Sequence, residues 1–453
     1  MAAKSRIVTL LVLTAFWLGL CLAGDGHAAT WHFSPAGSDT LGNGSSAAPW
    51  SDPSYHNASF QPGDRLEVDP GTYAPRWGWA LTASGSAAGG YITLQCAPDH
   101  GSKIRVAAPY LAAIAVTHGG AYWDITGCDV VASGTDDSAI AVTGGFSGPF
   151  GALHHVVIEN NILHDSACNG IAVQGRGNGG QPVDYLIVRN NIVYGNAASA
   201  PSGCSGISFN APVPYDSQPG YHLLVQQNIA YNNLACAACR PVTTAGNGVV
   251  FDDFRHAQTP GQPYRASVLV ENNLIFNNGG NGIQVSLSDN IRIRHNTSWG
   301  NLQDRNHCAG GYEIGAVMSS NITVTNNIAE ATRDKMCNGR VSALYEFGAD
   351  QSTGDLFDWN LAHGVGTTPV AADNSVRFAW GPHNLIGPDP ALTAPVSPAG
   401  PLAIAQIVAG FVPKRSSPAL LHGTTADSPA VDLMGSRRRL VGSADLGAIQ
   451  VGP

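Results

Sequence analysis

The chain has 453 residues, of which 54 are glycine, 28 are proline and only 12% are charged. Soluble proteins carry about 25% charged residues, and a helical bundle needs more Ala, Leu, Glu and Lys than this chain offers, so an all-helical fold is disfavoured. The formal net charge of −9 argues against nucleic acid or an anionic membrane as the main partner. The apolar fraction of 44% is sufficient for a long core, which argues against disorder.

The N-terminus has the pattern of a secretory signal peptide. Lys4 and Arg6 precede an apolar run over residues 7–23, and small residues follow as far as Ala28. This order of charged, apolar and small residues predicts removal of residues 1–28 and a secreted or periplasmic protein. No later stretch approaches 18 consecutive apolar residues, so no membrane span is expected in the mature chain.

A short motif with asparagine recurs along the middle of the chain: an aliphatic residue, two variable residues, Asn, then usually an aliphatic residue. The recurrent Asn stands 23 to 45 residues from the next copy, at positions 161, 191, 228, 273, 296, 327 and 360. A second element follows each Asn motif, as in residues 169–173, 205–209, 247–251 and 281–285, each with a glycine before a short apolar alternation.

Short strands repeated at this spacing, with loops of variable length between them, predict an all-β fold, a parallel β-solenoid made of a single winding strand. Each coil lacks a complete core, and a neighbouring coil about 4.8 Å away supplies the missing apolar surface and backbone pairing. We expect the solenoid to span residues 29–390 and an irregular C-terminal segment, residues 391–453, to pack on it. The protein is expected to be a monomer.

Eight cysteines remain after signal-peptide cleavage, and an even number in an exported chain favours disulfides. Cys168 and Cys204 each precede the glycine of a repeated second element by two residues, so equivalent places on successive coils predict a disulfide between them. Similar reasoning predicts Cys308–Cys337 and, by a looser match, Cys96–Cys128. Elimination leaves Cys236–Cys239.

Motifs at the two ends of the chain resemble those of a known group. The opening segments 31–39, 48–50, 62–64 and 70–73 and the closing segments 417–419, 435–437 and 445–448 are similar to the entry and exit of secreted right-handed parallel β-helix proteins. That group includes calcium-dependent pectate lyases and alginate or chondroitin lyases. The resemblance spans nearly all of residues 30–450 and implies a right-handed β-helix. It also implies a carbon–oxygen lyase that cleaves an acidic, uronate-containing polysaccharide by β-elimination.

Alternation along each strand predicts which side chains face solvent. If the glycine of each second element is position zero, positions one and three point inward and positions two and four face solvent. This count places Gln284 and Asp252 outside. The same count applied to the repeated Tyr-Glu-(Ile/Phe)-Gly-Ala places Glu313 and Glu346 outside too, in the row of Gln284. Stacked carboxylates repel unless a cation or a proton separates them. Asp252, Asp253, Glu313 and Glu346 therefore predict a cluster that binds Ca²⁺ or shares a proton. The alternative is that each acid is solvated or pairs with an arginine such as Arg255, Arg265 or Arg340.

The loops beside these acids supply the other candidates. In the pectate lyase family an acidic calcium cluster lies beside a lysine base; here Asp252 and Asp253 would match the acidic part, and Arg255 or His256 would replace the lysine. Lys335 is another candidate base. The predicted substrate contacts are Gln284, Arg265, His307 and Tyr312, because they lie on or beside the same face.

Two other functions stay open. The adjacent Asp252 and Asp253 also look like the paired aspartates of β-helix polygalacturonases, which are hydrolases, although the characteristic Asn-Thr-Asp and Gly-His-Gly segments are absent. A non-catalytic, exported glycan-binding protein needs only an aromatic and polar surface.

Overall fold

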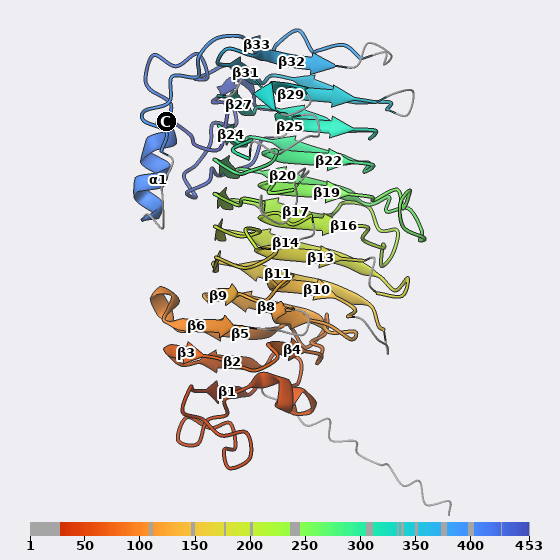
Figure 1. Cartoon of the computed structure of the whole chain (residues 1–453), viewed down its shortest axis with the longest axis vertical. Coiled ribbons are helices and arrows are strands. Elements are labelled where there is room, and N and C mark those ends of the chain that lie inside the picture. Colours follow the sequence, from red (N-terminus) through yellow and green to blue (C-terminus); the bar gives the residue numbers. More distant parts are fainter. Residues whose placement is uncertain are drawn as a thin grey trace, which may run out of the picture.

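The structure is a computed structural model that describes residues 28–107, 112–145, 150–175, 178–199, 203–235, 245–304, 311–332, 335–336, 339–348, 352–372, 378–396, 403–426 and 428–452. The predicted signal peptide therefore lies almost wholly outside the described residues. In the described part, three long sheets run along one axis, and each turn of the chain contributes a strand to each sheet in the same order (Figure 1). This is the predicted right-handed parallel β-helix.

The three sheets are named A, B and C. Sheet A contains β1 (Thr30–Phe33), β2 (Arg65–Val68), β5 (Ile92–Cys96), β8 (Ala121–Thr126), β11 (Leu153–Glu159), β14 (Val183–Arg189), β17 (Tyr221–Gln226), β20 (Ser267–Glu271), β23 (Ile291–Arg294), β26 (Thr323–Thr325) and β30 (Leu356–Asp358). Sheet B contains β4 (Trp79–Leu81), β7 (Ala112–Val116), β10 (Ser138–Thr143), β13 (Ile171–Gln174), β16 (Ile207–Asn210), β19 (Val249–Asp252), β22 (Ile283–Ser286), β25 (Gly311–Val317), β29 (Gly339–Phe347) and β32 (Thr368–Ala372), with β28 (Lys335–Met336) antiparallel to β29. Sheet C contains β3 (Gly71–Tyr73), β6 (Ser102–Val106), β9 (Asp129–Ala132), β12 (Ile162–His164), β15 (Ile192–Tyr194), β18 (Ile229–Tyr231), β21 (Leu274–Phe276), β24 (Thr297–Trp299), β27 (Ile328–Ala331), β31 (Leu361–Gly364) and β33 (Leu385–Ile386).

The core is a column of aliphatic side chains inside the coils. In sheet B the predicted inner row pairs residue for residue, from Ile171 to Ile207, Val249 and Ile283, and all four side chains are fully buried. The period-two alternation places every second residue of each strand in this column. The apolar alternation of the second element therefore became the inner face, as predicted.

The recurrent asparagines form a ladder inside the turn between sheets A and C. Each Asn donates its side-chain amide to the next, for example from Asn191 Nδ2 to Asn228 Oδ1 (3.0 Å) and from Asn228 Nδ2 to Asn273 Oδ1 (3.0 Å). The same oxygens also accept from backbone N–H groups, as Asn273 Oδ1 does from Asn228 N (2.9 Å). The ladder extends beyond the last predicted position, because Asn360 donates to Asn384 (3.1 Å). These bonds satisfy polar groups that the turn buries.

A second ladder, which the sequence reasoning missed, runs parallel to the first. It consists of Asn196, Asn233, Asn278 and Asn301, and Asn233 Nδ2 donates to Asn278 Oδ1 (2.9 Å). Each member follows a first-ladder asparagine by five residues, so the signal was present in the sequence. The short strands of sheet C separate the two ladders, which therefore fix both ends of these strands.

Two predicted disulfides are confirmed. Cys96 pairs with Cys128, and Cys168 pairs with Cys204, each between neighbouring coils, with Cα–Cα distances of 5.0 and 5.1 Å. The predicted pairs Cys236–Cys239 and Cys308–Cys337 lie outside the described residues. The confirmed bonds follow from the coil spacing, which lies within the range that a disulfide spans.

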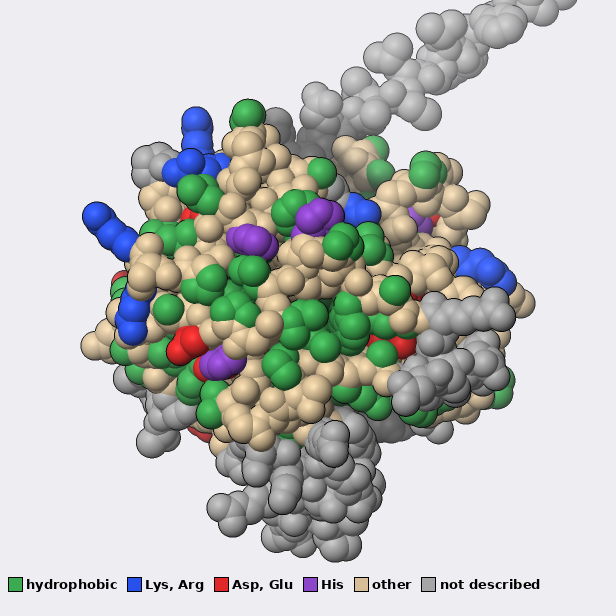
Figure 2. All heavy atoms as spheres, turned by 90° about the horizontal axis from the view of Figure 1, so that it is seen from above, with side chains coloured by type: hydrophobic (Ala, Val, Ile, Leu, Met, Phe, Trp, Pro, Cys, Tyr) green, Lys and Arg blue, Asp and Glu red, His purple; other side chains and the backbone are tan. Residues whose placement is uncertain are grey.

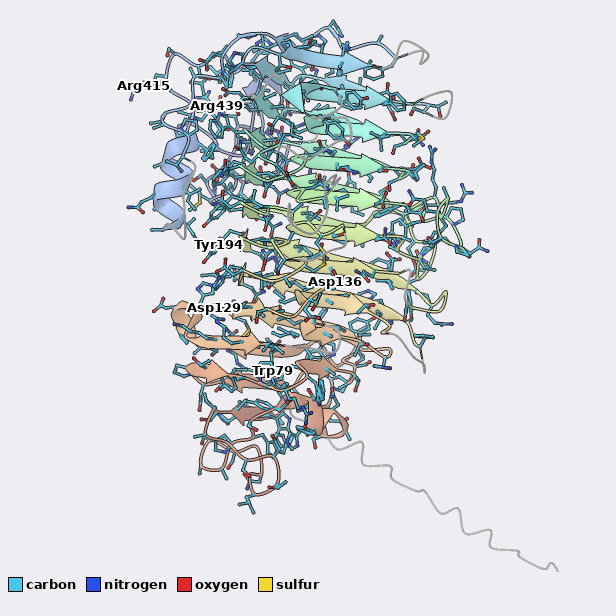
Figure 3. The ribbon with its side chains drawn as sticks, viewed as in Figure 1. Trp79, Asp129, Asp136, Tyr194, Arg415 and Arg439 are labelled. Atoms are coloured by element: carbon cyan, nitrogen blue, oxygen red, sulfur yellow. A yellow bond between two sulfur atoms is a disulfide. The ribbon has the colours of Figure 1, made fainter. Side chains whose placement is uncertain are left out.

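The C-terminal segment covers the outer face of sheet C. It contains α1 (Ile404–Phe411), β34 (Gly423–Thr424) and β35 (Ser443–Ala444), and α1 lies beside the stack in Figure 1. A column of stacked rings on sheet C includes Tyr194, Tyr231 and Phe276, and Phe411 of α1 packs against Phe276 at 4.7 Å. Figure 3 shows Tyr194 on the same side of the stack as Arg415 and Arg439 of this segment.

The two ends of the solenoid are closed by aromatic residues. At the N-terminal end, Trp50 stacks on Trp31 and on His56 of the short 3-10 helix η1 (Pro53–Ser59). A second 3-10 helix, η2 (Pro98–His100), lies between β5 and β6. At the other end, Phe378 and Trp380 pack edge-to-face on Phe357. Figure 2 looks onto this end and shows apolar side chains gathered over its centre. Among the described residues, the structure contains no helix with the length and apolarity that crossing a membrane requires.

Candidate functional site

The outer face of sheet B carries a row of polar side chains in register. Gln174, Asn210, Asp252 and Ser286 pair with one another along β13, β16, β19 and β22. The parallel register stacks them at the coil spacing of about 4.8 Å. A neighbouring outer row contains Ser208, Val250 and Gln284. The outward placement predicted for Asp252 and Gln284 is therefore confirmed.

Asp252 is the carboxyl group at the centre of this row. Asn210 Nδ2 donates to its Oδ2 at 3.3 Å, and the Ser286 side chain provides a second hydrogen bond. Burial raises the pKa of Asp252 above its ordinary value, the charge of Asp253 adds to the rise, and the hydrogen bonds oppose it. In these two rows of β13 to β25, whose residues are all described, Asp252 is the single carboxyl group.

Asp253 is adjacent in sequence but belongs to a different environment. It has a positive φ of 57° and is fully buried in the turn after β19. Its carboxylate accepts from Gln258 N (2.9 Å) and from Thr259 Oγ1 (2.6 Å). Because short polar side chains tolerate this backbone conformation and bond to nearby groups, Asp253 closes the turn. The predicted pairing of Asp253 with Asp252 in one exposed cluster is wrong.

Arg255 and His256 anchor the same turn to neighbouring coils. Arg255 Nη2 lies 2.7 Å from Asp289 Oδ1 and 2.8 Å from Ser320 Oγ. His256 Nε2 lies 3.0 Å from the backbone oxygen of Pro212. These contacts supply a structural role for both residues. Arg255 forms its ion pair with Asp289, which is not one of the four predicted acids, so this contact does not confirm the alternative that those acids pair with Arg255.

The predicted outward placement of Glu313 and Glu346 is wrong. In the structure, Ile314 pairs with Ile283, so Gly315 occupies the row of Gln284 and Glu313 does not. Glu346 pairs with Ala316, in the inner row of Val285, and both glutamates are fully buried. The physical reason is a difference in register. Gly311 is not equivalent to the glycine before β22, because Ile314 is the residue that pairs with Ile283. The two Tyr-Glu copies are not equivalent to each other either, because Tyr345 pairs with Gly315.

Glu313 instead lies in the interior, at the end of the second asparagine ladder. Its Oε1 accepts from Asn301 N (2.9 Å), and its Oε2 accepts from Ser298 Oγ (2.7 Å) and from Asn301 Nδ2 (2.5 Å). Burial raises the pKa of Glu313 to about 7, and the hydrogen bonds from Asn301 and Ser298 oppose the rise. A single Ca²⁺ site therefore does not fit the four predicted acids, which face three different environments.

The predicted substrate contacts have different positions. Tyr312 is 2% exposed and stacks on Tyr345 at 5.0 Å, over the Cβ position that Gly315 leaves open. Gln284 accepts a hydrogen bond from Asn281 Nδ2 (2.9 Å), and Arg265 is exposed. His307 lies outside the described residues, and of Lys335 only the backbone is described. The structure thus brings Gln284 close to the row of Asp252 and buries Tyr312 beside it.

Comparison with known proteins supports the fold. No family model and no curated protein matches the sequence. Among solved structures, the complex of XylC with xylose is 12% identical, with a TM-score of 0.51 over 76% of this chain and 70% of that chain. Pectate lyase Pel9A is 16% identical over 95% of this chain and 98% of that chain, with a TM-score of 0.49. Alginate lyase from Paenibacillus sp. str. FPU-7 is 14% identical over 78% and 98%, with a TM-score of 0.39. Of these, only the likeness to the XylC complex has a TM-score above 0.5, and at 12% identity it supports the fold alone.

Proposed function

We propose that the protein cleaves an acidic polysaccharide by β-elimination on the outer face of sheet B, with Asp252 as the base. The observation that carries the proposal is a single half-buried carboxyl group with a raised pKa between uncharged hydrogen-bonding side chains. A base is most effective when its pKa approaches the working pH, and burial moves Asp252 in that direction.

The proposed reaction requires one base and no co-reactant. Asp252 takes the proton from C5 of the uronate, the electrons of that C–H bond form the C4–C5 double bond, and the C4–O bond breaks. The leaving oxygen then takes up a proton. The amide N–H groups of Asn210 and Gln284 are the proposed donors to the uronate carboxylate, because hydrogen bonds to a charged acceptor are the stronger ones.

Hydrolysis of the polygalacturonase type ranks below elimination. Glycoside hydrolases typically use two carboxyl groups, one on each side of the scissile bond. In the polygalacturonase comparison the second carboxyl group is Asp253, whose carboxylate is buried in its own turn. No proposed step passes through Ca²⁺, since the four predicted ligands do not form one site.

The test compares two isosteric substitutions at adjacent positions. Asp252→Asn removes the proposed base, and we expect it to abolish the ultraviolet absorbance of unsaturated products from pectate, alginate or a glycosaminoglycan while the protein stays folded. Asp253→Asn disrupts the bond to Thr259, and we expect it to lower the free energy of unfolding by about 1–3 kcal/mol while activity per folded molecule is retained.

Three outcomes decide between the functions. Full activity in Asp252→Asn refutes the assignment of the base. New reducing ends without unsaturated products indicate a hydrolase, and polysaccharide binding without either product indicates a glycan-binding protein. Adding a chelator to the wild-type assay tests the Ca²⁺ prediction separately, because loss of activity would show a cation requirement.

We also propose that the protein acts outside the cytoplasm. The two disulfides support this location, since such bonds persist in oxidising compartments. Mass spectrometry of the exported protein is expected to find an N-terminus after Ala28.

A further inference from the structure

Three side chains that commonly bind metals converge where the C-terminal segment meets sheet C. They are Glu330 of β27, His363 of β31 and Asp389 of the segment after β33, and one potential ligand atom from each lies within 4.8 Å of the others. Glu330 and His363 are paired in register on neighbouring strands, so the solenoid itself holds these two side chains together. Asp389 follows β33 by three residues, and β33 pairs with the strand of His363, so Asp389 comes from the adjacent coil.

The imidazole of His363 has an unused nitrogen that faces this cluster. Its Nδ1 is buried and has no hydrogen-bond partner among the described residues. The Glu330 Oε1 atom lies 3.6 Å away, which is too long for a hydrogen bond. A buried nitrogen without a partner is unfavourable, and a metal ion is one group that would satisfy it.

The two carboxylates are also in an unfavourable arrangement without a cation. Glu330 is 9% exposed, and one of its carboxylate oxygens lies within 4.8 Å of a carboxylate oxygen of Asp389. Two carboxylates in close approach favour the presence of a cation, and no arginine or lysine of the described residues forms an ion pair with either of them.

We propose that Glu330, His363 and Asp389 form a binding site for a divalent transition metal ion of the zinc class. One imidazole nitrogen and two carboxylate oxygens are a donor set that suits Zn²⁺, whereas Ca²⁺ and Mg²⁺ prefer oxygen alone. Three protein ligands leave a fourth tetrahedral position for water, and the exposed side of Asp389 is open to solvent.

The position of the site indicates its role. Asp389 lies between β33 and α1, so a bound ion connects the start of the C-terminal segment to two coils of the solenoid. The ion therefore fastens the cover of sheet C and stabilises the folded chain by mass action. The site is separate from the row of Asp252 on sheet B, and the inference does not depend on the proposed function.

Another group of potential ligands does not support a metal site. Asp136, Cys168 and Cys204 also lie within 4.8 Å of one another. Both sulfur atoms are joined in a disulfide and cannot act as thiolate ligands. Figure 3 shows that Asp136 lies away from the side of Arg415 and Arg439.

The test measures zinc binding to the full, tag-free chain after chelator treatment. We expect equilibrium dialysis followed by elemental analysis to find one Zn²⁺ per chain in the wild type. The variants His363→Ala and Asp389→Asn are expected to bind Zn²⁺ more weakly by at least about tenfold, as loss of a partner does at metal sites. Asp389 is exposed, so Asp389→Asn keeps the test valid if His363→Ala does not fold.

The matched control is His383→Ala. His383 also pairs with a carboxylate, with its Nδ1 2.8 Å from Asp358 Oδ2, but it belongs to no group of three potential ligands within the part of the chain that the structure describes. It is expected to bind Zn²⁺ as the wild type does and to show the same rise in melting temperature on zinc addition. The proposal is overturned if the wild type binds no zinc. It is also overturned if the wild type, the two ligand variants and the control bind zinc equally well.

Discussion

Glu313 occupies the place where the next asparagine of the second ladder would lie. An asparagine there would accept through one oxygen and donate through its amide, but the glutamate accepts three hydrogen bonds from Asn301 and Ser298 through two oxygens. The second ladder thus ends at the Glu313 carboxylate, which only accepts hydrogen bonds. It can donate one to a further group only when it is protonated. The buried acid is therefore a part of the scaffold whose charge depends on pH.

Stability is expected to depend on pH through Glu313. Its pKa rises from an ordinary value of 4.5 to about 7 in the folded chain, so the folded state holds this proton more tightly than the unfolded state does. The resulting stabilisation is complete below pH 4.5 and is lost as the pH rises through 7, at up to about 1.4 kcal/mol per pH unit. Denaturant unfolding of the wild type and Glu313→Gln across this range measures the effect.

The glutamine variant cannot titrate, so its stability is expected to change less over the same range. Glu67→Gln is the control, because Glu67 is a partly exposed surface carboxyl beside Arg65. If Glu313→Gln and the wild type keep a constant difference in unfolding free energy from pH 4.5 to 7, the raised pKa is wrong.

At the scale of the element, the two asparagine ladders stand at the two ends of β15, β18, β21 and β24 in sheet C. Asn273 illustrates the density of these contacts. Its Nδ2 donates to Val225 O (2.9 Å) and to Asn296 Oδ1 (2.9 Å), while its Oδ1 accepts from the backbone and side chain of Asn228. A hydrophobic residue of similar size fills the same space but leaves these buried groups without partners.

Asn273→Ala is expected to lower the free energy of unfolding by about 3 kcal/mol, because several buried donors and acceptors lose their partner at once. Asn384→Ala, at the half-buried end of the same ladder, is expected to cost about 1 kcal/mol since water can replace the lost bonds. Thermal or denaturant unfolding of both variants measures the difference. Equal losses at the two positions would contradict a ladder whose strength depends on burial.

At the scale of the whole molecule, the C-terminal segment covers an outer face of sheet C that is apolar. Phe411 of α1 lies against Phe276 (4.7 Å) and Trp299 (5.8 Å) and is 1% exposed. Arg438 Nη2 donates to Asn272 Oδ1 (2.7 Å), which links the same segment to the turn after β20. The solenoid and its C-terminal segment are therefore packed through both apolar and polar contacts.

Phe411→Ala is expected to weaken the packing of this segment by about 3–5 kcal/mol, because it removes a large buried side chain. Limited proteolysis with mass spectrometry is expected to show faster cleavage within residues 387–452 than in the wild type. Ile404→Ala at the exposed start of α1 is the control and should leave the cleavage rate unchanged. Unchanged cleavage in Phe411→Ala would show that the segment is held by other contacts.

The sequence predicted the solenoid, two of its disulfides and the outward position of Asp252, because each depends on a local period. Two-residue alternation fixes the face of a side chain, and a repeated asparagine fixes a turn. The same reasoning failed for Glu313, since the glycine before it resembles the glycine before β22 but is not equivalent to it in register.

Other features depend on contacts between distant parts of the chain. Whether Asp253 faces solvent is decided by the turn that it closes with Thr259, and the partner of Arg255 is supplied by the next coil as Asp289. The approach of Asp389 to Glu330 and His363 depends on the pairing of β33 with β31, which brings the residues after β33 beside the two preceding coils. Periodicity gives a side chain its face, whereas its partners come from coils that only the tertiary structure brings within reach.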